Sequence, residues 1–309
     1  NYIDEKKKKD EILVYFMPAS SGPCRFGQYN VYLRNFIKNN KLENVAVLTL
    51  SDKNNYAGFG IKAMKATWKT LMVADAMTDI RNTLRAIAKD PKSAIEIFEK
   101  EWIKMKNSIA KKSNISLKKQ ILKSSLIFKK IPLKIPFKEA NKIALIGEIY
   151  VRQDQLSRQN LIDRLAKKNI IVKIAPVAEF IYYINYLSRY NILNNNKLDA
   201  KEKIKLNITY LYQTYQERKI KRIFEKSGLY DFEMIDIAKT IDHAAHLMSK
   251  KFTGEAILTT GLALREVLHS ATGVISIGPF GCMPSRVAES LLNEGMTVNG
   301  KIIASDNKS

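Results

Sequence analysis

The chain has 309 residues, of which 46% are hydrophobic, and its 52 Lys and Arg against 30 Asp and Glu give a formal net charge of +22. A chain of this length usually builds more than one hydrophobic core, so we expect two domains. No run of about 18 apolar residues occurs, which excludes a membrane-spanning helix. Two cysteines and no secretory leader predict a cytoplasmic protein.

Residues 1–60 predict part of a first α/β lobe. The apolar run at 12–17 indicates a buried strand, the periodicity over 28–39 an amphipathic helix, and the run at 45–50 a second strand. These elements form a minimal βαβ unit. Cys24 lies in the loop that leaves the first strand, where glycine and proline break the pattern.

Residues 61–141 predict a helical insertion. An apolar stripe runs from Trp68 to Ile87 at helical spacing and should end at Asp90-Pro91. Asp75 interrupts this stripe, and we interpret it as a capped or paired buried carboxylate.

Residues 100–142 contain thirteen lysines, no arginine and only two acids. We interpret this stretch as a solvated helical face away from any site. Docking to an acidic partner and steering of a CoA phosphate are the alternatives. The lack of arginine and of paired aromatic residues argues against nucleic acid as a partner.

Residues 142–309 predict a second α/β lobe. Its strands are expected at 142–151, 170–174 and 274–277, with a helix from Leu161 and a helical insertion over about 177–250. The polar loop after the first of these strands carries three candidates for a second ligand shell or for substrate binding, with loop solvation and capping as the alternative: Arg152, Asp154 and Gln155.

Three further local patterns lie in the second lobe. His243 and His246 are three residues apart on a predicted helix, and we interpret them as structural residues with satisfied hydrogen bonds rather than as metal ligands. Thr253 is expected to cap a helix whose Gly261 permits close packing on the final strand.

Cys282 has the same surroundings as Cys24. It follows a predicted strand and precedes a helix that has Pro284 in its first turn and Gly295 at its end. Both thiols should therefore lie at the carboxyl end of a strand beside a helix amino terminus, which favours a thiolate. A buried apolar role and a disulfide explain the pair less well, so ligation of a soft metal centre or a redox pairing remains.

Four segments carry a resemblance to a known family: GPCRFGQY around Cys24, GEIYVR at 147–152, GEAILTTGLALREVL at 254–268 and GVISIGPFGCMPSRV around Cys282. Together they make nearly the whole chain resemble the carboxyl-terminal part of the activase-related proteins of the 2-hydroxyacyl-CoA dehydratase superfamily. That superfamily includes the dehydratase D-component subunits and the double-cubane cluster proteins.

This resemblance implies two Rossmann-like parallel-sheet lobes with large helical insertions that share an iron–sulfur cluster, either [4Fe–4S] or a double cubane. It implies Cys24 and Cys282 as metal ligands.

Gln28, in the segment around Cys24, is a further candidate for cofactor binding. Arg25 directly follows Cys24, and Arg286 lies in the first turn after Cys282. Arg152 follows a third strand end, so we expect at least two of these three guanidinium groups to point into the cleft between the lobes. Surface ion pairs, such as one with Glu289, are the alternative.

In the family, an ATP-dependent activase delivers a low-potential electron to such a cluster, which then reduces a difficult substrate, often an acyl-CoA. The resemblance thus implies electron transfer in anaerobic metabolism, and it leaves open whether this chain is an enzyme.

Family members usually supply a further cluster cysteine from an upstream domain, in a Cys-(Phe/Tyr)-Pro-x-Lys-type element that this sequence lacks. The chain starts at Asn1 and continues through a lysine-rich segment of linker composition. We therefore expect a piece of a longer protein, with upstream domains or a partner subunit completing the cluster. A cluster-free scaffold or docking module for an acidic partner, with structural cysteines, is the second interpretation. Neither a Walker P-loop nor a dinucleotide fingerprint is present, so an ATP hydrolase or NAD enzyme is not supported.

Overall fold

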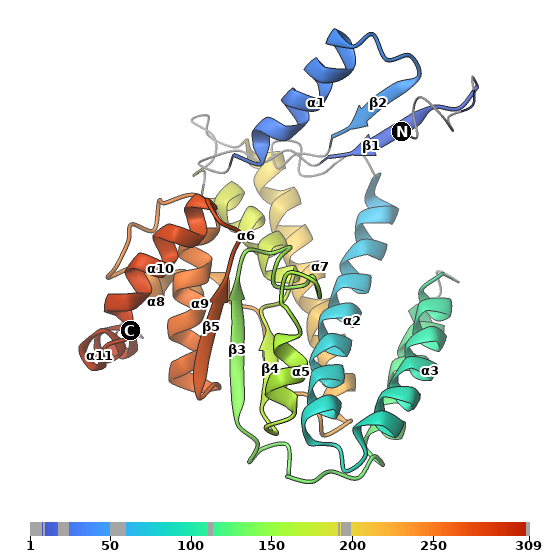
Figure 1. The fold of residues 1–309 in the computed structure, drawn as a ribbon, viewed down its shortest axis with the longest axis vertical. Helices are drawn as coiled ribbons and strands as arrows, with labels where there is room; N and C mark the ends of the chain where they lie inside the picture. Colours follow the sequence, from blue (N-terminus) through green and yellow to red (C-terminus); the bar gives the residue numbers. More distant parts are fainter. Residues whose placement is uncertain are drawn as a thin grey trace. The chain divides into compact units, whose positions relative to one another are not determined.

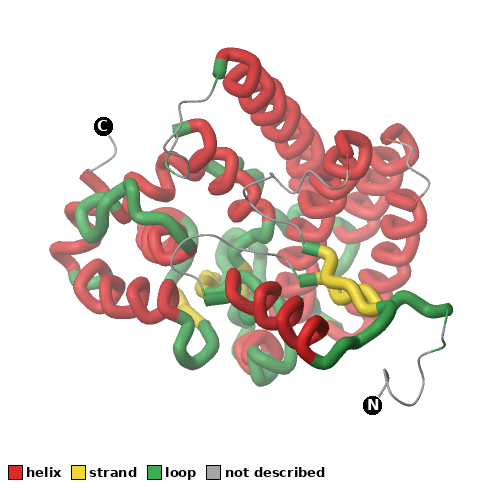
Figure 2. Tube along the Cα trace, turned by 90° about the horizontal axis from the view of Figure 1, so that it is seen from above, coloured by secondary structure: helices red, strands yellow, loops and turns green. Residues whose placement is uncertain are grey.

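The computed structural model describes residues 8, 10–17, 25–49, 60–110, 114–190, 192 and 199–306. It divides into two units, 1–63 and 64–309. The architecture is mixed α/β with small parallel sheets, and most of the chain is helical (Figure 2).

The first unit contains the predicted βαβ arrangement. Strands β1 (Leu13–Phe16) and β2 (Val45–Leu48) pair in parallel and are joined by helix α1 (Gly27–Asn39). The guanidinium group of Arg34 on α1 donates hydrogen bonds to the Val47 carbonyl and the Thr49 hydroxyl, which fixes the helix on β2. The predicted strands and helix of this region are therefore confirmed, but the expected burial of the first strand is wrong, since Val14, Tyr15 and Phe16 on β1 are exposed.

The remaining elements, some of which Figure 1 labels, lie in the second unit, apart from the first residues of α2. Three helices come first: α2 (Gly60–Ile87), α3 (Pro91–Ala110) and α4 (Asn114–Phe128). Strand β3 (Lys142–Gly147), helix α5 (Leu161–Ala166) and strand β4 (Ile171–Ile174) follow. The chain then forms α6 (Ala178–Arg189), α7 (Ala200–Glu225), α8 (Ile237–Ala244), α9 (Glu255–His269), β5 (Gly273–Ile277), α10 (Met283–Gly295) and α11 (Val298–Asp306).

The sheet of the second unit has the order β4-β3-β5, with all strands parallel. Its central strand β3 is buried along most of its length, as expected for a parallel sheet that is covered on both faces. The carboxyl ends of the three strands, at Gly147, Ile174 and Ile277, share one edge. This edge is where open α/β sheets place their ligands.

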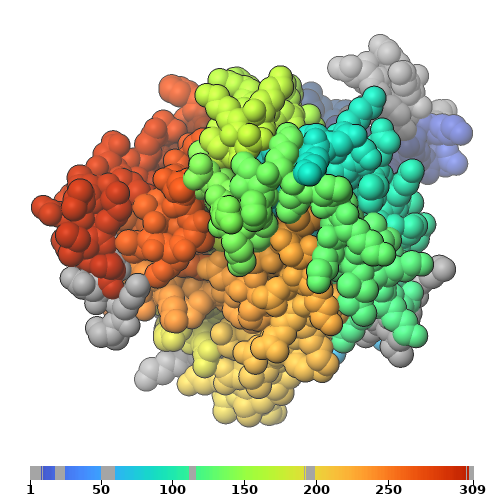
Figure 3. All heavy atoms as spheres, turned by 90° about the horizontal axis from the view of Figure 1, so that it is seen from below, coloured from blue at the N-terminus to red at the C-terminus, as the bar shows by residue number. Residues whose placement is uncertain are grey.

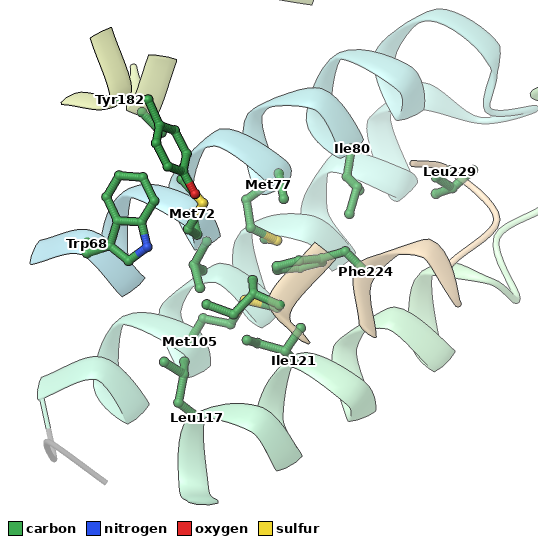
Figure 4. Close-up of a cluster of buried hydrophobic side chains, with 14 of the residues drawn as sticks. Trp68, Met72, Met77, Ile80, Met105, Leu117, Ile121, Tyr182, Phe224 and Leu229 are labelled. Carbon is green, nitrogen blue, oxygen red and sulfur yellow. The ribbon is translucent and has the colours of Figure 1, made fainter. Parts of the chain in front are cut away.

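The main hydrophobic core joins the helices that precede β3 in the chain to the helices between β4 and β5. Figure 4 shows this cluster, with side chains from α2, α3 and α4 in contact with α6 and α7. Tyr182 and Trp68 meet edge to face with ring centroids 4.9 Å apart. The helices over 61–128 and the helices after β4 therefore share one core. Pro91 begins α3, so the predicted helix break after Asp90 is confirmed.

Two predictions about α9 were wrong. Its N-cap is Gly254 rather than Thr253, because the chain turns there with a φ of 107°, which glycine adopts without strain. Gly261 packs against α8 rather than the final strand, since a Cβ at this position would lie 1.9 Å from the Thr240 carbonyl oxygen. The absence of a side chain lets α8 and α9 approach closely.

Most lysines of the lysine-rich stretch that the structure describes are exposed, but Lys118 is half-buried and the Lys142 side chain is only 13% exposed. Lys104 and Lys106 on α3 and Lys119 and Lys123 on α4 are all exposed, as predicted. From Lys129 onward the stretch forms a loop rather than a helix. Figure 3 shows this loop in green beside the orange segment after α7, where Lys138 and Lys142 pair with Asp231.

Among the described helices, none combines the length and the apolar character that crossing a bilayer requires.

Candidate functional site

Cys282 is the N-cap residue of α10, at the carboxyl edge of the sheet, as predicted. Pro284 occupies the first turn, and Gly295 ends the helix. The thiol is free and partly exposed. Its position places the residue at the positive end of the α10 dipole.

The loop that carries Cys282 is held by close packing. The Ser285 hydroxyl donates a hydrogen bond to the Cys282 sulfur over 3.2 Å. A Cβ at Gly278 would lie only 2.4 Å from the same hydroxyl oxygen, so glycine at 278 leaves the room that Ser285 occupies. At the tip of this loop Phe280 is fully exposed, and Met283 is half-exposed. The sulfur therefore has one fixed donor and apolar neighbours that are open to solvent.

Arg152 is buried and binds backbone carbonyl groups at the same edge. Its guanidinium group donates to the Gly147 carbonyl over 3.1 Å and to the Pro176 carbonyl over 3.2 Å, which ties the end of β3 to the start of α6. Its Nε is buried without a hydrogen-bond partner. The positive charge of Arg152 lowers the pKa of Asp75 and of Glu179 against the larger, opposite effect of burial.

The other predicted site residues lie in different surroundings. Cys24 is outside the described residues. Arg25 and Gln28 are exposed at the start of α1, in the first unit. Arg286 is half-exposed and forms an ion pair with Glu289, 2.7 Å away. The two residues lie three positions apart on α10, so they are neighbours on its surface.

Asp154 and Gln155 lie in a solvated loop, as the alternative interpretation of these residues expected. Asp154 accepts hydrogen bonds from the backbone N–H and the hydroxyl of Ser157, and these bonds lower its pKa. Gln155 is exposed.

The two histidines do not face one way on a helix. Helix α8 ends at Ala244, so His243 is helical and His246 lies in the following turn. Both ring nitrogens of His246 are buried without a hydrogen-bond partner, so the prediction of a satisfied structural role is wrong for this residue. The His243 ring lies 5.9 Å from that of His269. Within the ranges that the structure describes, no three His, Cys, Asp or Glu side chains gather in a way that can hold a metal ion.

A second polar centre lies between the sheet and the helices α2, α7 and α9. Lys173 on β4 pairs with Glu233 at 2.9 Å and with Glu266 at 3.1 Å. Arg265 on α9 pairs with Glu233 as well. These groups line a cavity of about 70 Å³, which is room for several water molecules.

Two carboxyl groups line this cavity without a matching cation in contact. Asp79 on α2 and Glu179 on α6 accept no hydrogen bond and form no ion pair within the described part of the chain, and Glu179 is only 3% exposed. Burial raises the pKa of each to about 7.

The paired acids of the cavity behave differently. Burial alone would raise the pKa of Glu233, but Lys173 and Arg265 bring it down to about 2. Asp75 accepts hydrogen bonds from the backbone N–H groups of Val177 and Ala178, both at 3.2 Å, and so caps α6. Burial still raises its pKa to about 6. The interpretation of Asp75 as a capped carboxylate is confirmed.

Sequence patterns contained only part of this second centre. Asp79 stands four residues after Asp75 and thus near it on the same helix, and Lys173 interrupts an otherwise apolar strand. A charge in a buried strand signals a buried ion pair. Its partners Glu233 and Glu266 lie 60 and 93 residues away, so local spacing does not identify them.

Comparisons of the chain with protein-family models, with curated proteins and with solved structures found no match.

Proposed function

We propose that this chain is part of an iron–sulfur protein of the 2-hydroxyacyl-CoA dehydratase and activase-related superfamily, in which Cys282 and Cys24 each bind a cluster shared by two Rossmann-like lobes. The observation that carries the proposal is Cys282 itself: a free, partly exposed thiol at the N-cap of α10 and at the carboxyl edge of a parallel sheet. An iron–sulfur cluster takes cysteine sulfur ligands, and the exposed part of this thiol leaves it open to one.

The described residues fit one corner of such a cluster. Cys282 supplies a soft ligand, and Ser285 donates a hydrogen bond to its sulfur. Clusters usually take three or four cysteine ligands, so Cys24 and ligands from upstream domains or a partner subunit would complete the set. The exposed Phe280 and Met283 beside the thiol are consistent with a site that another part of the protein covers.

When bound, the cluster would supply low-potential electron transfer toward a difficult substrate such as an acyl-CoA, with an ATP-dependent activase as electron donor. The residues of this chain would then set its environment. The Ser285 hydroxyl and the dipole of α10 both stabilise negative charge on the sulfur, which raises a reduction potential. Arg152 keeps the strand ends fixed at the edge where the loop emerges.

Replacement of Cys282 by serine in the intact protein tests the proposal. Serine is a good N-cap residue, so Cys282→Ser should keep the stability of α10 while it removes the soft ligand. We expect less bound iron and an unchanged urea unfolding curve. Ser285→Ala is the matched control, since it keeps the thiol and should keep the iron. Full iron content in Cys282→Ser would contradict ligation by this residue.

A further inference from the structure

Helix α7 presents an apolar seam to solvent. Its exposed large side chains are Ile204 at 58%, Ile208 at 62%, Leu211 at 65% and Tyr215 at 52%. The opposite face of the helix is buried through Gln213, Glu217, Ile220 and Phe224. The seam therefore lies on a helix whose other side is already packed against the protein.

The spacing of the seam is that of a coiled coil. Its residues follow one another by four, three and four positions, which is the heptad pattern of a and d residues. At about 100° per residue they fall within a sector of about 60°. A surface helix that packs on a broad core or lies on a membrane has an apolar face of about 100° or more, whereas a narrow seam suits one partner helix. Asn207 and Thr214 border the seam on one side.

Basic residues continue the seam at both ends. By the same heptad spacing, Lys201 precedes Ile204, and Arg218 and Arg222 follow Tyr215. Lys205 and Lys219 border the seam on its other side. All five side chains are exposed. Glu225, at the last turn, is the nearest acid on this side of the helix.

This charge pattern disfavours a second copy of the chain as the occupant. A parallel pair of α7 helices would place each basic end against the same basic end. An antiparallel pair would place Lys201 and Lys205 against the arginines of the other copy. Like charges oppose association in both orientations, so the seam calls for an acidic partner.

We propose that the α7 seam is a docking site for one amphipathic helix with acidic flanks and acidic seam positions at its ends. The apolar centre would supply the contact area, and Lys201, Arg218 and Arg222 would set the register and select the partner. This proposal does not depend on the iron–sulfur proposal.

Two designed helical peptides of about four heptads test the seam by fluorescence anisotropy with the full chain. Both peptides have leucine at the central a and d positions. At the flanking positions and at the two ends of the seam, one peptide carries glutamate and the other carries lysine. We expect saturable binding of the glutamate peptide and at least tenfold weaker binding of the lysine peptide, as like charges would require.

Matched variants separate the seam from the general positive charge of the protein. Leu211→Glu should weaken binding of the glutamate peptide about tenfold or more, because it places a charge in the seam. Leu126→Glu introduces the same charge at an exposed leucine on α4 and should keep the affinity. Arg218→Glu should shift the preference toward the lysine peptide.

Equal affinities of the two leucine variants would overturn the proposal. So would binding of anionic phosphatidylserine vesicles with loss in Leu211→Glu but no binding of either peptide, which would assign the seam to a lipid surface. A dimer in light scattering that Leu211→Glu dissociates would assign it to a second copy.

Discussion

Lys173 shows at the residue scale how the structure compensates a partly buried charge. A lysine within the four-residue strand β4 would be costly alone, but Glu233 and Glu266 lie within 3.1 Å of its ammonium group. Burial alone would lower the pKa of Lys173, and the two carboxylates raise it instead. The charge is therefore kept, and its partners hold β4 to α9 and to the segment after α7.

Lys173→Met should lower the free energy of unfolding by about 3 kcal/mol, because it removes a cation from the buried carboxylate of Glu266 and from the partly exposed carboxylate of Glu233. Lys250→Met is the matched control, since Lys250 pairs with Asp242 at 2.6 Å on the surface. That pair is exposed, so its loss should cost less than about 1 kcal/mol. Urea unfolding of both variants measures the difference, and equal losses would show that the buried network contributes no more than a surface pair.

Asp79 should make stability depend on pH. Its folded pKa of about 7 lies above the value of 3.8 for an unperturbed aspartate, so the folded state binds this proton more tightly. The resulting stabilisation is full below about pH 4 and is lost as the pH rises through 7. The Asp79→Asn variant has no carboxyl group at this position and should not show this loss. Between pH 5 and pH 8 its free energy of unfolding should rise by about 2 kcal/mol relative to that of the parent, because each unit of pKa shift corresponds to about 1.4 kcal/mol.

Urea unfolding of the parent and the variant at pH 5 and at pH 8 measures this change. Asp154→Asn is the control, because Asp154 is exposed and hydrogen bonds lower its pKa, so its substitution should give no such gain. A difference between parent and Asp79→Asn that is the same at both pH values would mean that Asp79 is not protonated more readily in the folded state.

At the scale of elements, the contact between α8 and α9 depends on Gly261. A Cβ there would meet the Thr240 carbonyl oxygen, which belongs to backbone and yields only if one helix shifts. Gly261→Ala should lower the free energy of unfolding by about 2 kcal/mol or more. Gly273→Ala, at the start of β5, adds a methyl group where no atom lies within 4 Å and should be nearly neutral. A stable Gly261→Ala protein would show that the helices are not closely packed there.

Most strands and several helix boundaries followed from local pattern. The apolar runs predicted β1 to β5, and proline at 91 and 284 marked the starts of α3 and α10. The strand expected over 142–151 ends at Gly147, because the chain turns at 148–153 despite its apolar residues. The cap of α9 was misplaced because a threonine beside Gly254 satisfied the usual cap preference, while the backbone required a positive φ. The partner of Gly261 was missed because a glycine in a helix reveals close approach but not which element approaches.

The candidate site was predictable in the same uneven way. Cys282 lies where its strand–loop–helix pattern placed it. Arg152 was recognised as a residue of the sheet edge. The carbonyl groups that accept its hydrogen bonds, those of Gly147 and Pro176, lie at the ends of two different strands that only the tertiary structure brings together. The cavity around Asp79 joins segments up to about 190 residues apart, so its charge pairs have no local signature.

At the scale of the whole molecule, the net charge of +22 should act on partners rather than on the proposed cluster. Replacing the exposed Lys119, Lys123, Lys129 and Lys130 by glutamine should leave unfolding and iron content unchanged, and should weaken any contact that is sensitive to salt. Iron analysis and urea unfolding of this variant beside the parent check the prediction. Loss of iron would connect the lysine-rich stretch with the cluster site.

The iron and acid-labile sulfide content of the intact protein, purified without oxygen and recorded with its visible spectrum, tests the central proposal most directly. We predict that the parent protein is coloured and contains both iron and sulfide. Replacing Cys24 and Cys282 by serine should remove most of each, while the urea unfolding transition of the second unit should not change. A colourless parent without sulfide, or a doubly substituted protein that keeps its iron, would contradict the assignment of these two cysteines to a cluster.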